Sequence, residues 1–412
     1  MDQYLTRSMS AAASDILVSV FARTDVGRHR GGNEDAFLIA DLTSGKVGLG
    51  PEVTTHSVGE RGSLLIVSDG MGGAAAGEVA SEIAVTAIRQ CLLEIPSNIE
   101  TPNRLRIATE LANEAIWKEA QAKPELTGMG ATVTAALVQG ATTFIAQVGD
   151  SRAYIIRGDR IKQITKDQSY AQALRDSGIF TAEQIANAPQ NVILQALGAQ
   201  PTVDVGLTAV ELLRNDYLIV CSDGLSGKIK PDEMRDVVCK SSTNLTSACR
   251  RLVDMANERG GEDNITVIVA LFDGVGLDAA NESTSITGSF KSLSKDHRSQ
   301  QPIPETMPLS SLPPADESSR TVMMSALSSP RRTPSEPKAE AVAAEAVSPE
   351  MIEDAPASIQ KPKPVTIVLK PKTREKKNKW LTWMILLLVV LLLVFVAAYF
   401  LDIELFDIEL FD

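Results

Sequence analysis

The sequence contains few of the residues that bind zinc or form disulfides. Its 412 residues include three histidines and four cysteines. The histidines, His29, His56 and His297, show no metal-ligand spacing, and no two cysteines form a Cys-x-x-Cys pair. This pattern disfavours a zinc hydrolase built on imidazole ligands. It also predicts that the catalytic part of the chain is reduced and intracellular.

An excess of positive charge is also lacking. The formal net charge is -12 and the isoelectric point is about 5.0. A nucleic-acid-binding surface would be strongly basic, so we expect no nucleic-acid partner. A secretory signal peptide has a basic segment followed by an apolar run. The first ten residues do not contain this pattern, so we expect no signal peptide there.

Three sequence patterns of phosphate-handling enzymes are absent. No cysteine starts a Cys-x5-Arg pattern, so a cysteinyl-phosphate mechanism is excluded. No Asp-x-Asp-x-Thr/Val pattern supports an aspartyl-phosphate mechanism. There is no nucleotide-binding Gly-x4-Gly-Lys-Ser/Thr loop, because Gly227-Lys228 is followed by Ile229.

Acidic residues at the ends of apolar runs are the most informative feature that is present. The six positions are Glu34, Asp35, Asp69, Asp150, Asp223 and Asp263. The runs at residues 64–67, 144–148 and 218–221 each lead into an aspartate, and Asp263 precedes the run at 265–271. Such short runs are typical of buried strands. Like charges gathered at one sheet edge repel and lose hydration. Oxygen ligands without histidine therefore favour magnesium or manganese there.

Two further residues fit phosphate chemistry around such a metal site. Gly70 follows Asp69, and a glycine lets the backbone approach a ligand closely, so its carbonyl could be an extra oxygen ligand. Two divalent ions about 3.5–4 Å apart would generate a hydroxide that attacks phosphorus directly. Arg30 would bind the phosphate oxygens with its guanidinium.

Six motifs occur in an order that resembles a known family. They are residues 24–35 (with Arg30-Gly-Gly-Asn-Glu-Asp35), Asp69-Gly-Met-Gly-Gly73, Gly128-Met-Gly-Ala-Thr132, Gly149-Asp-Ser-Arg152, Ser222-Asp-Gly-Leu225 and Gly261-Glu-Asp-Asn-Ile-Thr266. Together they resemble the type 2C (PPM) metal-dependent serine/threonine protein phosphatases, and most of all the bacterial branch that opposes Ser/Thr kinases. The resemblance covers about residues 14–272.

The resemblance implies a role for each candidate residue in a site with two Mn²⁺ or Mg²⁺ ions, or three. Asp69 would bridge the first two metals, and Gly70 would contribute its carbonyl. Asp223 and Asp263 would complete the first metal. With Arg30, these three aspartates are the predicted catalytic residues.

The remaining candidate residues would support that core. Glu34 would act at the second metal, directly or through water, with Asp35 in the adjacent shell. Asp150 would help Asp223 hold a third, weaker ion, and Arg30 would bind the substrate phosphate. An ordinary structural ion pair between Asp150 and Arg152 is the alternative interpretation of Asp150.

The chain departs from the family pattern at several positions. Met71 stands where animal members carry a histidine, a proposed general acid, and Ala74 stands where bacterial members commonly have a histidine. Gln168 stands where histidine is common, and Gln195 where arginine is common. The last two changes fall around the variable flap and therefore concern substrate preference more than the chemistry.

The fold class implied is α+β, a four-layer α/β/β/α sandwich of two antiparallel sheets flanked by helices. Apolar periodicity predicts helices over residues 78–93, 104–122 and 246–259. The predicted phosphatase domain covers residues 14–272.

The remainder of the chain predicts a membrane anchor. Residues 273–369 are rich in Ser, Pro and Ala and predict a disordered linker. The basic segment 370–379 precedes an uncharged apolar run at 380–401, long enough at roughly 33 Å to form a single C-terminal transmembrane helix. The tail at 402–412 is acidic. The positive-inside rule then places the catalytic domain in the cytoplasm and the C-terminus outside the cell membrane.

These observations predict a membrane-anchored, Mg/Mn-dependent phosphoserine/phosphothreonine protein phosphatase. Its expected partners are phosphorylated proteins, among them membrane Ser/Thr kinases and their substrates, and the lipid bilayer. A non-catalytic phosphoprotein-binding scaffold is one alternative, which metal binding without turnover would favour. A phosphatase serving a dedicated regulator is another, but Arg30 and the Gly149–Arg152 motif favour the general Ser/Thr branch.

Overall fold

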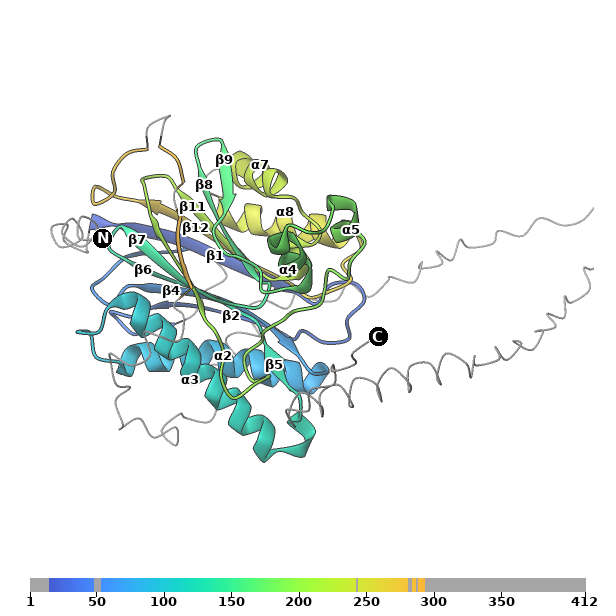
Figure 1. Cartoon of the computed structure of the whole chain (residues 1–412). Coiled ribbons are helices and arrows are strands. Elements are labelled where there is room, and N and C mark those ends of the chain that lie inside the picture. Colours follow the sequence, from blue (N-terminus) through green and yellow to red (C-terminus); the bar gives the residue numbers. More distant parts are fainter. Residues whose placement is uncertain (1–14, 48–52, 242–243, 281–283, 287, 293–412) are drawn as a thin grey trace, which may run out of the picture. The chain divides into compact units, whose positions relative to one another are not determined.

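The computed structural model describes residues 15–47, 53–241, 244–280, 284–286 and 288–292. Two antiparallel sheets form its centre (Figure 1). The six-stranded sheet has the order β3 (Thr54–Ser57), β1 (Leu17–Asp25), β12 (Ile265–Asp273), β11 (Tyr217–Cys221), β8 (Arg152–Arg157), β9 (Arg160–Gln163). The seven-stranded sheet contains β13 (Gly288–Ser292), β10 (Gly206–Glu211), β7 (Thr142–Val148), β6 (Val133–Gln139), β4 (Ser63–Met71) and β2 (Asp35–Asp41), with β5 (Gly130–Ala131) paired to the end of β4.

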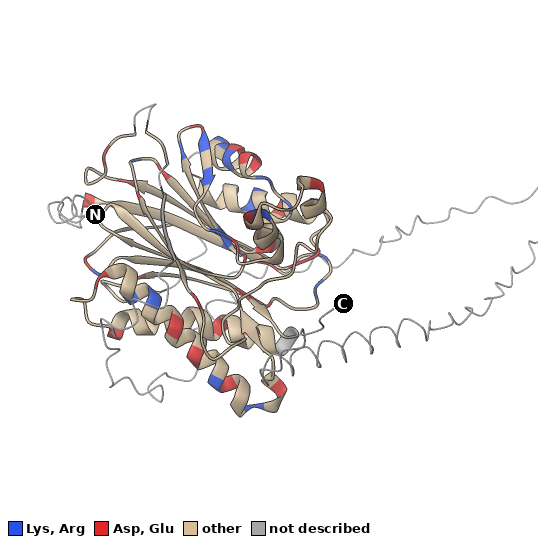
Figure 2. Cartoon of the chain, viewed as in Figure 1, with Lys and Arg blue, Asp and Glu red and all other residues tan. Residues whose placement is uncertain are grey.

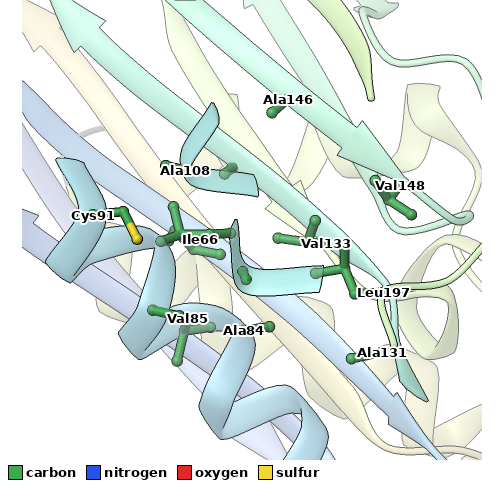
Figure 3. Close-up of a cluster of buried hydrophobic side chains, with 14 of the residues drawn as sticks. Ile66, Ala84, Val85, Cys91, Ala108, Ala131, Val133, Ala146, Val148 and Leu197 are labelled. Carbon is green, nitrogen blue, oxygen red and sulfur yellow. The ribbon is translucent and has the colours of Figure 1, made fainter. Parts of the chain in front are cut away.

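Helices cover the outer faces of both sheets. Helices α2 (Ala74–Glu94) and α3 (Thr101–Ala122) pack on the seven-stranded sheet, and a hydrophobic cluster containing Ile66, Ile88 and Leu105 lies between them (Figure 3). Helices α7 (Pro231–Ser241) and α8 (Leu245–Glu258) pack on the six-stranded sheet. Shorter helices are η2 (Pro124–Leu126), α4 (Tyr170–Ser177), α5 (Ala182–Ala186) and α6 (Asp223–Ser226).

The inner strands are apolar on both faces because each sheet has a partner on each side. In β12, Ile268, Ala270 and Phe272 belong to the cluster between the sheets. Their neighbours Val267 and Val269 belong to the cluster beneath the helices. Successive side chains of a strand point to opposite faces, so a continuous apolar run is what a strand buried on both faces requires. Figure 2 shows the charged residues mainly on the helices and loops around these strands.

The predicted fold class is confirmed as two antiparallel sheets flanked by helices in four layers. The three predicted helices are confirmed as α2, α3 and α8, each with small shifts at its ends. The four apolar runs form parts of β4, β7, β11 and β12. Asp69 lies near the end of its strand, as the apolar run predicts, and β4 continues to Met71, where it pairs with β5.

The predicted domain boundary at residue 272 lies too early in the chain. Residues that follow β12 fold back onto the domain, and β13 adds an edge strand beside β10. Leu277 and Ile286 are 2% and 7% exposed and join the cluster between the sheets. Arg157 and Lys162 hold the returning segment by donating hydrogen bonds to the carbonyls of Ser285 and Ile286 at 3.2 and 2.9 Å. Apolar side chains at 277 and 286 explain why this part of the predicted linker is folded.

The predicted transmembrane helix at 380–401 lies outside the described residues. So do most of the predicted linker, the basic segment and the acidic tail. Within the described part of the chain, no helix combines the length and the apolar character needed to cross a membrane.

Candidate metal and phosphate site

Strand ends from both sheets bring the predicted acidic residues together. Asp35 opens β2 and lies directly opposite Asp69 at the end of β4. Asp223 follows β11 as the first residue of α6, and Asp263 lies in the turn before β12. Asp150 lies between β7 and β8 and is 8% exposed.

Mutual repulsion and burial shape the charge of this carboxylate cluster. Burial raises the pKa of Asp69 well above its ordinary value, and the nearby Asp35, Asp223, Asp263 and Asp150 raise it further. A strongly raised pKa at several adjacent carboxyls means that the folded chain holds them at a cost in free energy. Because carboxyls with raised pKa values cluster at functional sites, this grouping indicates a function rather than a contribution to packing.

The neighbouring carboxyls carry the same signal. Burial and nearby carboxylates raise the pKa of Asp35 and of Asp150 to about 7. The pKa of Asp223 is also raised, by burial first and then by Asp263, although a hydrogen bond with Asp69 lowers it in part. Four acidic side chains thus compete for too little positive charge.

Two carboxylate oxygens in the cluster have no partner. Oδ1 of Asp35 and Oδ1 of Asp223 are buried without a hydrogen bond, while Oδ2 of Asp35 accepts one from the Ser222 hydroxyl at 2.8 Å. A buried oxygen that lacks a donor costs free energy. Hard oxygen donors of this kind suit Mg²⁺ or Mn²⁺, so the donor set fits the implied ions. As they stand, no three His, Cys, Asp or Glu side chains in the described ranges are grouped closely enough to hold an ion.

Glycines make room for the backbone and for Glu34 beside Asp69. A Cβ on Gly70 would lie 2.0 Å from the carbonyl oxygen of Gly77, and a Cβ on Gly77 would lie 2.5 Å from Oε2 of Glu34. The Gly70 amide donates to the Glu34 carbonyl at 3.1 Å. At position 70 the close atom belongs to the backbone, so only glycine fits there, whereas a larger residue at 77 would displace the Glu34 side chain. These contacts place Glu34 and the Gly70 backbone next to Asp69.

Arg30 is the basic residue of the cluster. Its Nη2 lies 2.9 Å from Oδ2 of Asp263, and the Arg30 side chain is 45% exposed. The hydrogen bond to Asp263 raises the pKa of Arg30, and Glu34 and Asp69 add to the effect. The guanidinium therefore carries its charge at the mouth of the site, where it can meet an anionic group from solvent.

The structure shows supporting residues that the sequence interpretation did not single out. The side chain of Asn264 accepts a hydrogen bond from the Glu34 amide at 2.8 Å and donates to the carbonyls of Val26 and Gly32. Thr132 brackets Asp69, because its amide donates to the Asp69 carbonyl and its hydroxyl accepts from the Asp69 amide. Both residues lie inside quoted motifs, which was the available signal. Their roles depend on contacts across more than sixty residues.

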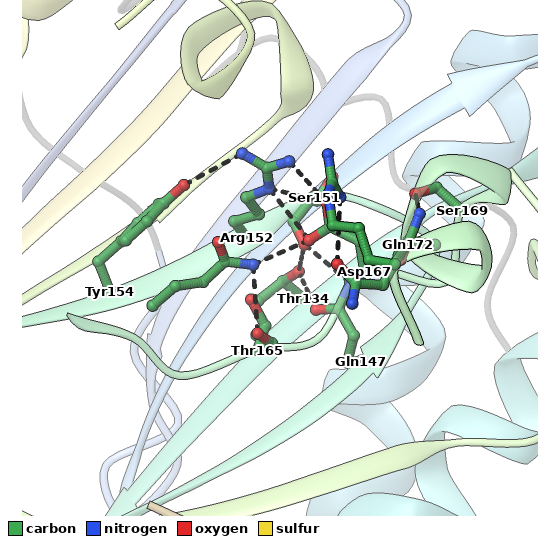
Figure 4. Close-up of polar contacts among 12 residues, drawn as sticks. Thr134, Gln147, Ser151, Arg152, Tyr154, Thr165, Asp167, Ser169 and Gln172 are labelled. Atoms are coloured by element: carbon green, nitrogen blue, oxygen red, sulfur yellow. Dashed lines mark hydrogen bonds and ion pairs between the residues drawn. The ribbon is translucent and has the colours of Figure 1, made fainter. Parts of the chain in front are cut away.

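The alternative interpretation of Asp150, an ion pair with Arg152, is wrong, because Arg152 pairs with Asp167. Arg152 binds Asp167 through its Nε and Nη2 atoms, the shortest contact being 2.6 Å, rather than pairing with Asp150 (Figure 4). Arg152 still lowers the pKa of Asp150 through its charge, as a smaller influence than burial. The result leaves Asp150 as a buried carboxyl beside a guanidinium that is already occupied.

All eight predicted site residues therefore lie at one end of the sheet sandwich. Glu34, Asp35, Asp69, Gly70, Asp150, Asp223, Asp263 and Arg30 are joined by the register, hydrogen bonds and charge interactions described above. Their arrangement places acidic oxygens in the interior and one guanidinium at the surface. The acidic oxygens attract cations, and the exposed guanidinium attracts an anion.

Comparisons with known proteins agree with this arrangement. Residues 53–269 match the family model for protein phosphatase 2C. The serine/threonine phosphatase stp of Listeria welshimeri is 35% identical over 251 residues, which is 60% of this chain and 93% of that relative.

Solved structures give the same result. The serine/threonine phosphatase PstP/Ppp of Mycobacterium tuberculosis is 32% identical with a TM-score of 0.53, covering 62% of this chain and 99% of that one. The catalytic domain of PstP in complex with two manganese ions has a TM-score of 0.52 at 32% identity, covering 63% of this chain and 99% of that one.

Proposed function

The chain belongs to the protein phosphatase 2C family, among its bacterial serine/threonine phosphatases, and on this premise we propose that its carboxylate cluster hydrolyses phosphoserine and phosphothreonine in proteins. The reaction would be a direct displacement at phosphorus without a covalent enzyme intermediate. The phosphoprotein substrates would include targets of bacterial Ser/Thr kinases.

The observation that supports the proposal most strongly is the uncompensated negative charge at the site. Asp69 lies among four other aspartates that raise its pKa, and two buried oxygens of Asp35 and Asp223 have no donor. A chain that folds around such a cluster needs a cation to offset it. A PstP catalytic domain in complex with two manganese ions is structurally similar to this chain.

We assign the cofactor to this set of residues. Asp69, the Gly70 carbonyl, Asp223 and Asp263 would hold one manganese or magnesium ion, with Asp69 shared with a second ion near Glu34 and Asp35. Asp150 would contribute to a third, weaker ion. When bound, a pair of such ions supplies positive charge to the phosphoryl group and lowers the pKa of a coordinated water.

The chain's own residues supply binding and orientation. Arg30 would exchange its contact with Asp263 for the equatorial oxygens of the phosphate, for which its exposed position suits it. Thr132 and Asn264 would keep the Asp69 and Glu34 backbones in place through their hydrogen bonds. Met71 has no titrating group, so solvent would protonate the leaving serine or threonine oxygen.

The test of the proposed function measures manganese-dependent release of phosphate from a phosphothreonine peptide by the full chain. Asp69→Asn and Asp223→Asn should each reduce kcat/KM by roughly 10²- to 10³-fold, the scale expected when an electrostatic group at a reaction centre is removed. Asp254→Asn, which changes an exposed aspartate of α8, is the matched control and should retain full activity. Retained activity in both site variants would rule out the mechanism.

We also propose that the chain is held at the cell membrane by residues 380–401, with the catalytic domain in the cytoplasm. The support is the sequence alone, an uncharged apolar run between a basic and an acidic segment. Tethering would raise the effective concentration of membrane-bound phosphoproteins, including kinases, around the site.

The tether can be tested by deleting residues 380–412. The deletion should release the protein from the membrane fraction, leave the rate on a soluble phosphopeptide unchanged and slow dephosphorylation of a membrane-bound kinase. Equal rates on both substrates before and after deletion would contradict a role for the tether in substrate choice.

A further inference from the structure

Two glutamines hold the peptide groups of one residue, Asp204. The Asp204 amide donates to Oε1 of Gln195 at 2.9 Å. Nε2 of Gln168 donates to the Asp204 carbonyl at 3.1 Å. These glutamines occupy the two positions where histidine and arginine are common in the family, and in this chain they meet at a single residue.

Gln168 also holds the loop that carries Asp150. Its side-chain Oε1 accepts a hydrogen bond from the Gly149 amide at 3.0 Å, and its backbone amide donates to the Gly149 carbonyl at 2.8 Å. Gly149 has a φ of +94°, and a Cβ there would lie 2.7 Å from the Thr132 side chain. Gly149 therefore packs closely against the Thr132 side chain, and Gln168 binds both its amide and its carbonyl.

The same glutamines lie at the two ends of the segment containing α4 and α5. The Leu194 amide donates to the Gln168 carbonyl at 2.8 Å, and the Tyr170 amide donates to the Val192 carbonyl at 2.8 Å. The chain thus leaves the domain at Gln168, forms α4 and α5, and returns at Gln195. A bridge through Asp204 joins both ends of this segment to the Gly149–Asp150 loop.

We propose that Gln168 and Gln195 act as one positioning pair, coupled through the Asp204 backbone, that fixes the Gly149–Asp150 loop relative to the carboxylate cluster. The inference rests on the proposed function, because the consequence for activity requires Asp150 to belong to the site. Neither glutamine has a hydrogen bond to the carboxylates of the cluster among the described residues. Their influence therefore passes through backbone position.

The two glutamines use their side-chain amides differently, so substitutions can remove one hydrogen bond at a time. This makes it possible to distinguish a coupled pair from two independent contacts. Gln168 both accepts and donates, so Gln168→Glu would keep the bond from Gly149 and lose the bond to Asp204. Gln195 accepts from Asp204, so Gln195→Glu would keep its bond. Methionine at either position preserves side-chain length and removes the polar atoms.

The first measurement is hydrogen exchange of the Gly149 amide in the full chain without added metal. Gln168→Met removes its acceptor, and exchange should rise by about fivefold, as the loss of one neutral hydrogen bond predicts. Gln195→Met should also raise exchange at Gly149, although it does not contact Gly149. The double variant should not exceed Gln168→Met by more than a small factor, and Gln195→Glu should restore protection.

The second measurement is the manganese concentration that gives half-maximal phosphatase activity. Loosening the residues that orient a metal-binding loop typically weakens metal affinity by 10-fold or more, so we expect a rise of roughly tenfold in Gln168→Met and a smaller one in Gln195→Met. The kcat at saturating manganese should change little. A raised manganese requirement with an unchanged kcat distinguishes a positioning role from loss of folded protein. Loss of folded protein would lower the measured activity at every manganese concentration.

Gln190→Met is the matched control. Its side chain donates to the carbonyls of Ile185 and Ala188 inside the same segment, without reaching Asp204. Gly149 exchange and manganese dependence should stay at the values of the unmodified protein. Unchanged Gly149 exchange in Gln195→Met would overturn the coupling, and so would a Gln190→Met effect equal to that of Gln195→Met. Failure of the proposed function would instead show as retained activity in Asp69→Asn, which the exchange measurement does not involve.

Discussion

Two groups of buried charge in this molecule are built in opposite ways. Arg157 and Asp216 have side chains 5% and 1% exposed and form a close ion pair, with Nη2 and Oδ2 2.7 Å apart. Their remaining polar atoms are also satisfied, because Arg157 donates to the Glu211 carbonyl and Asp216 accepts from the Leu213 amide. The carboxylate cluster around Asp69 instead gathers like charges and leaves two oxygens without donors.

The difference separates a structural charge cluster from a functional one. A buried charge that is paired and fully hydrogen-bonded needs nothing from outside the chain. A buried cluster of one sign is stable only if the fold around it supplies the free energy or if a cation binds. The Arg157 pair joins β8 to the residue before β11 and to the returning segment, whereas the carboxylates make only part of the contacts that would compensate their charge. We therefore expect function at the carboxylate cluster, where buried charges lack partners of opposite sign.

The largest effect on stability is expected from breaking the paired group. Arg157→Met would leave Asp216 buried without its cation, which typically costs about 3–5 kcal/mol. For a domain of this size the midpoint of thermal unfolding should fall by on the order of 10 °C. Activity per folded molecule at low temperature should not change, and calorimetry with an activity assay would measure both.

A second variant tests whether the pair itself is the cause. Arg157→Met combined with Asp216→Leu removes both charges and should recover part of the lost stability, because no uncompensated charge remains. A double variant as unstable as Arg157→Met would mean that packing, not charge, is responsible.

A smaller loss is expected when the returning segment is removed. Ending the chain after Phe272 deletes the buried Leu277 and Ile286 and the edge strand β13. At about 1.5–3 kcal/mol for each buried side chain, the loss should be roughly 3 kcal/mol once the conformational entropy of ordering the segment is subtracted. Ending the chain after Ser292 is the control and should leave denaturant unfolding unchanged. Equal stability of both shortened chains would show that residues 274–292 do not belong to the folded domain.

The last expected effect is a pH dependence of stability that comes from the carboxylate cluster. Asp35 and Asp150 have a pKa of about 7 in the folded chain against an ordinary value of 3.8. The folded chain thus binds more protons than the unfolded chain between about pH 4 and pH 7. Stability without metal should therefore fall as pH rises through this window.

Calorimetry between pH 4 and pH 7 would measure this decrease as a falling unfolding midpoint of the metal-free protein. Asp35→Asn together with Asp150→Asn should flatten this curve. Added manganese should reduce or reverse it, because the cation takes the place of the protons. An equally steep curve with and without manganese would be incompatible with a cation site at these carboxylates.

The fold was predictable where local pattern decides it. The apolar runs of β4, β7, β11 and β12 and the periodicity of α2, α3 and α8 identify these elements without tertiary information. The returning segment 274–292 was not predictable, because its Ser- and Gly-rich sequence resembles a linker. It is held by contacts that form only in the fold: two buried apolar residues, hydrogen bonds from Arg157 and Lys162, and pairing with β10. Asp69 was expected at the end of its strand and lies there, but the pairing with β5 that extends β4 to Met71 was not predictable from the apolar run.

The sequence by itself determined which residues are acidic, that oxygen ligands far outnumber histidines, and in which order the motifs follow. Those properties indicate hard cations and phosphate chemistry because they depend on residue type alone. Only the tertiary structure decided that Asp35 faces Asp69, that Arg152 pairs with Asp167, and that Gln168 and Gln195 meet at Asp204. Each of these contacts joins residues that chain folding, not local sequence, brings within hydrogen-bonding distance or strand register.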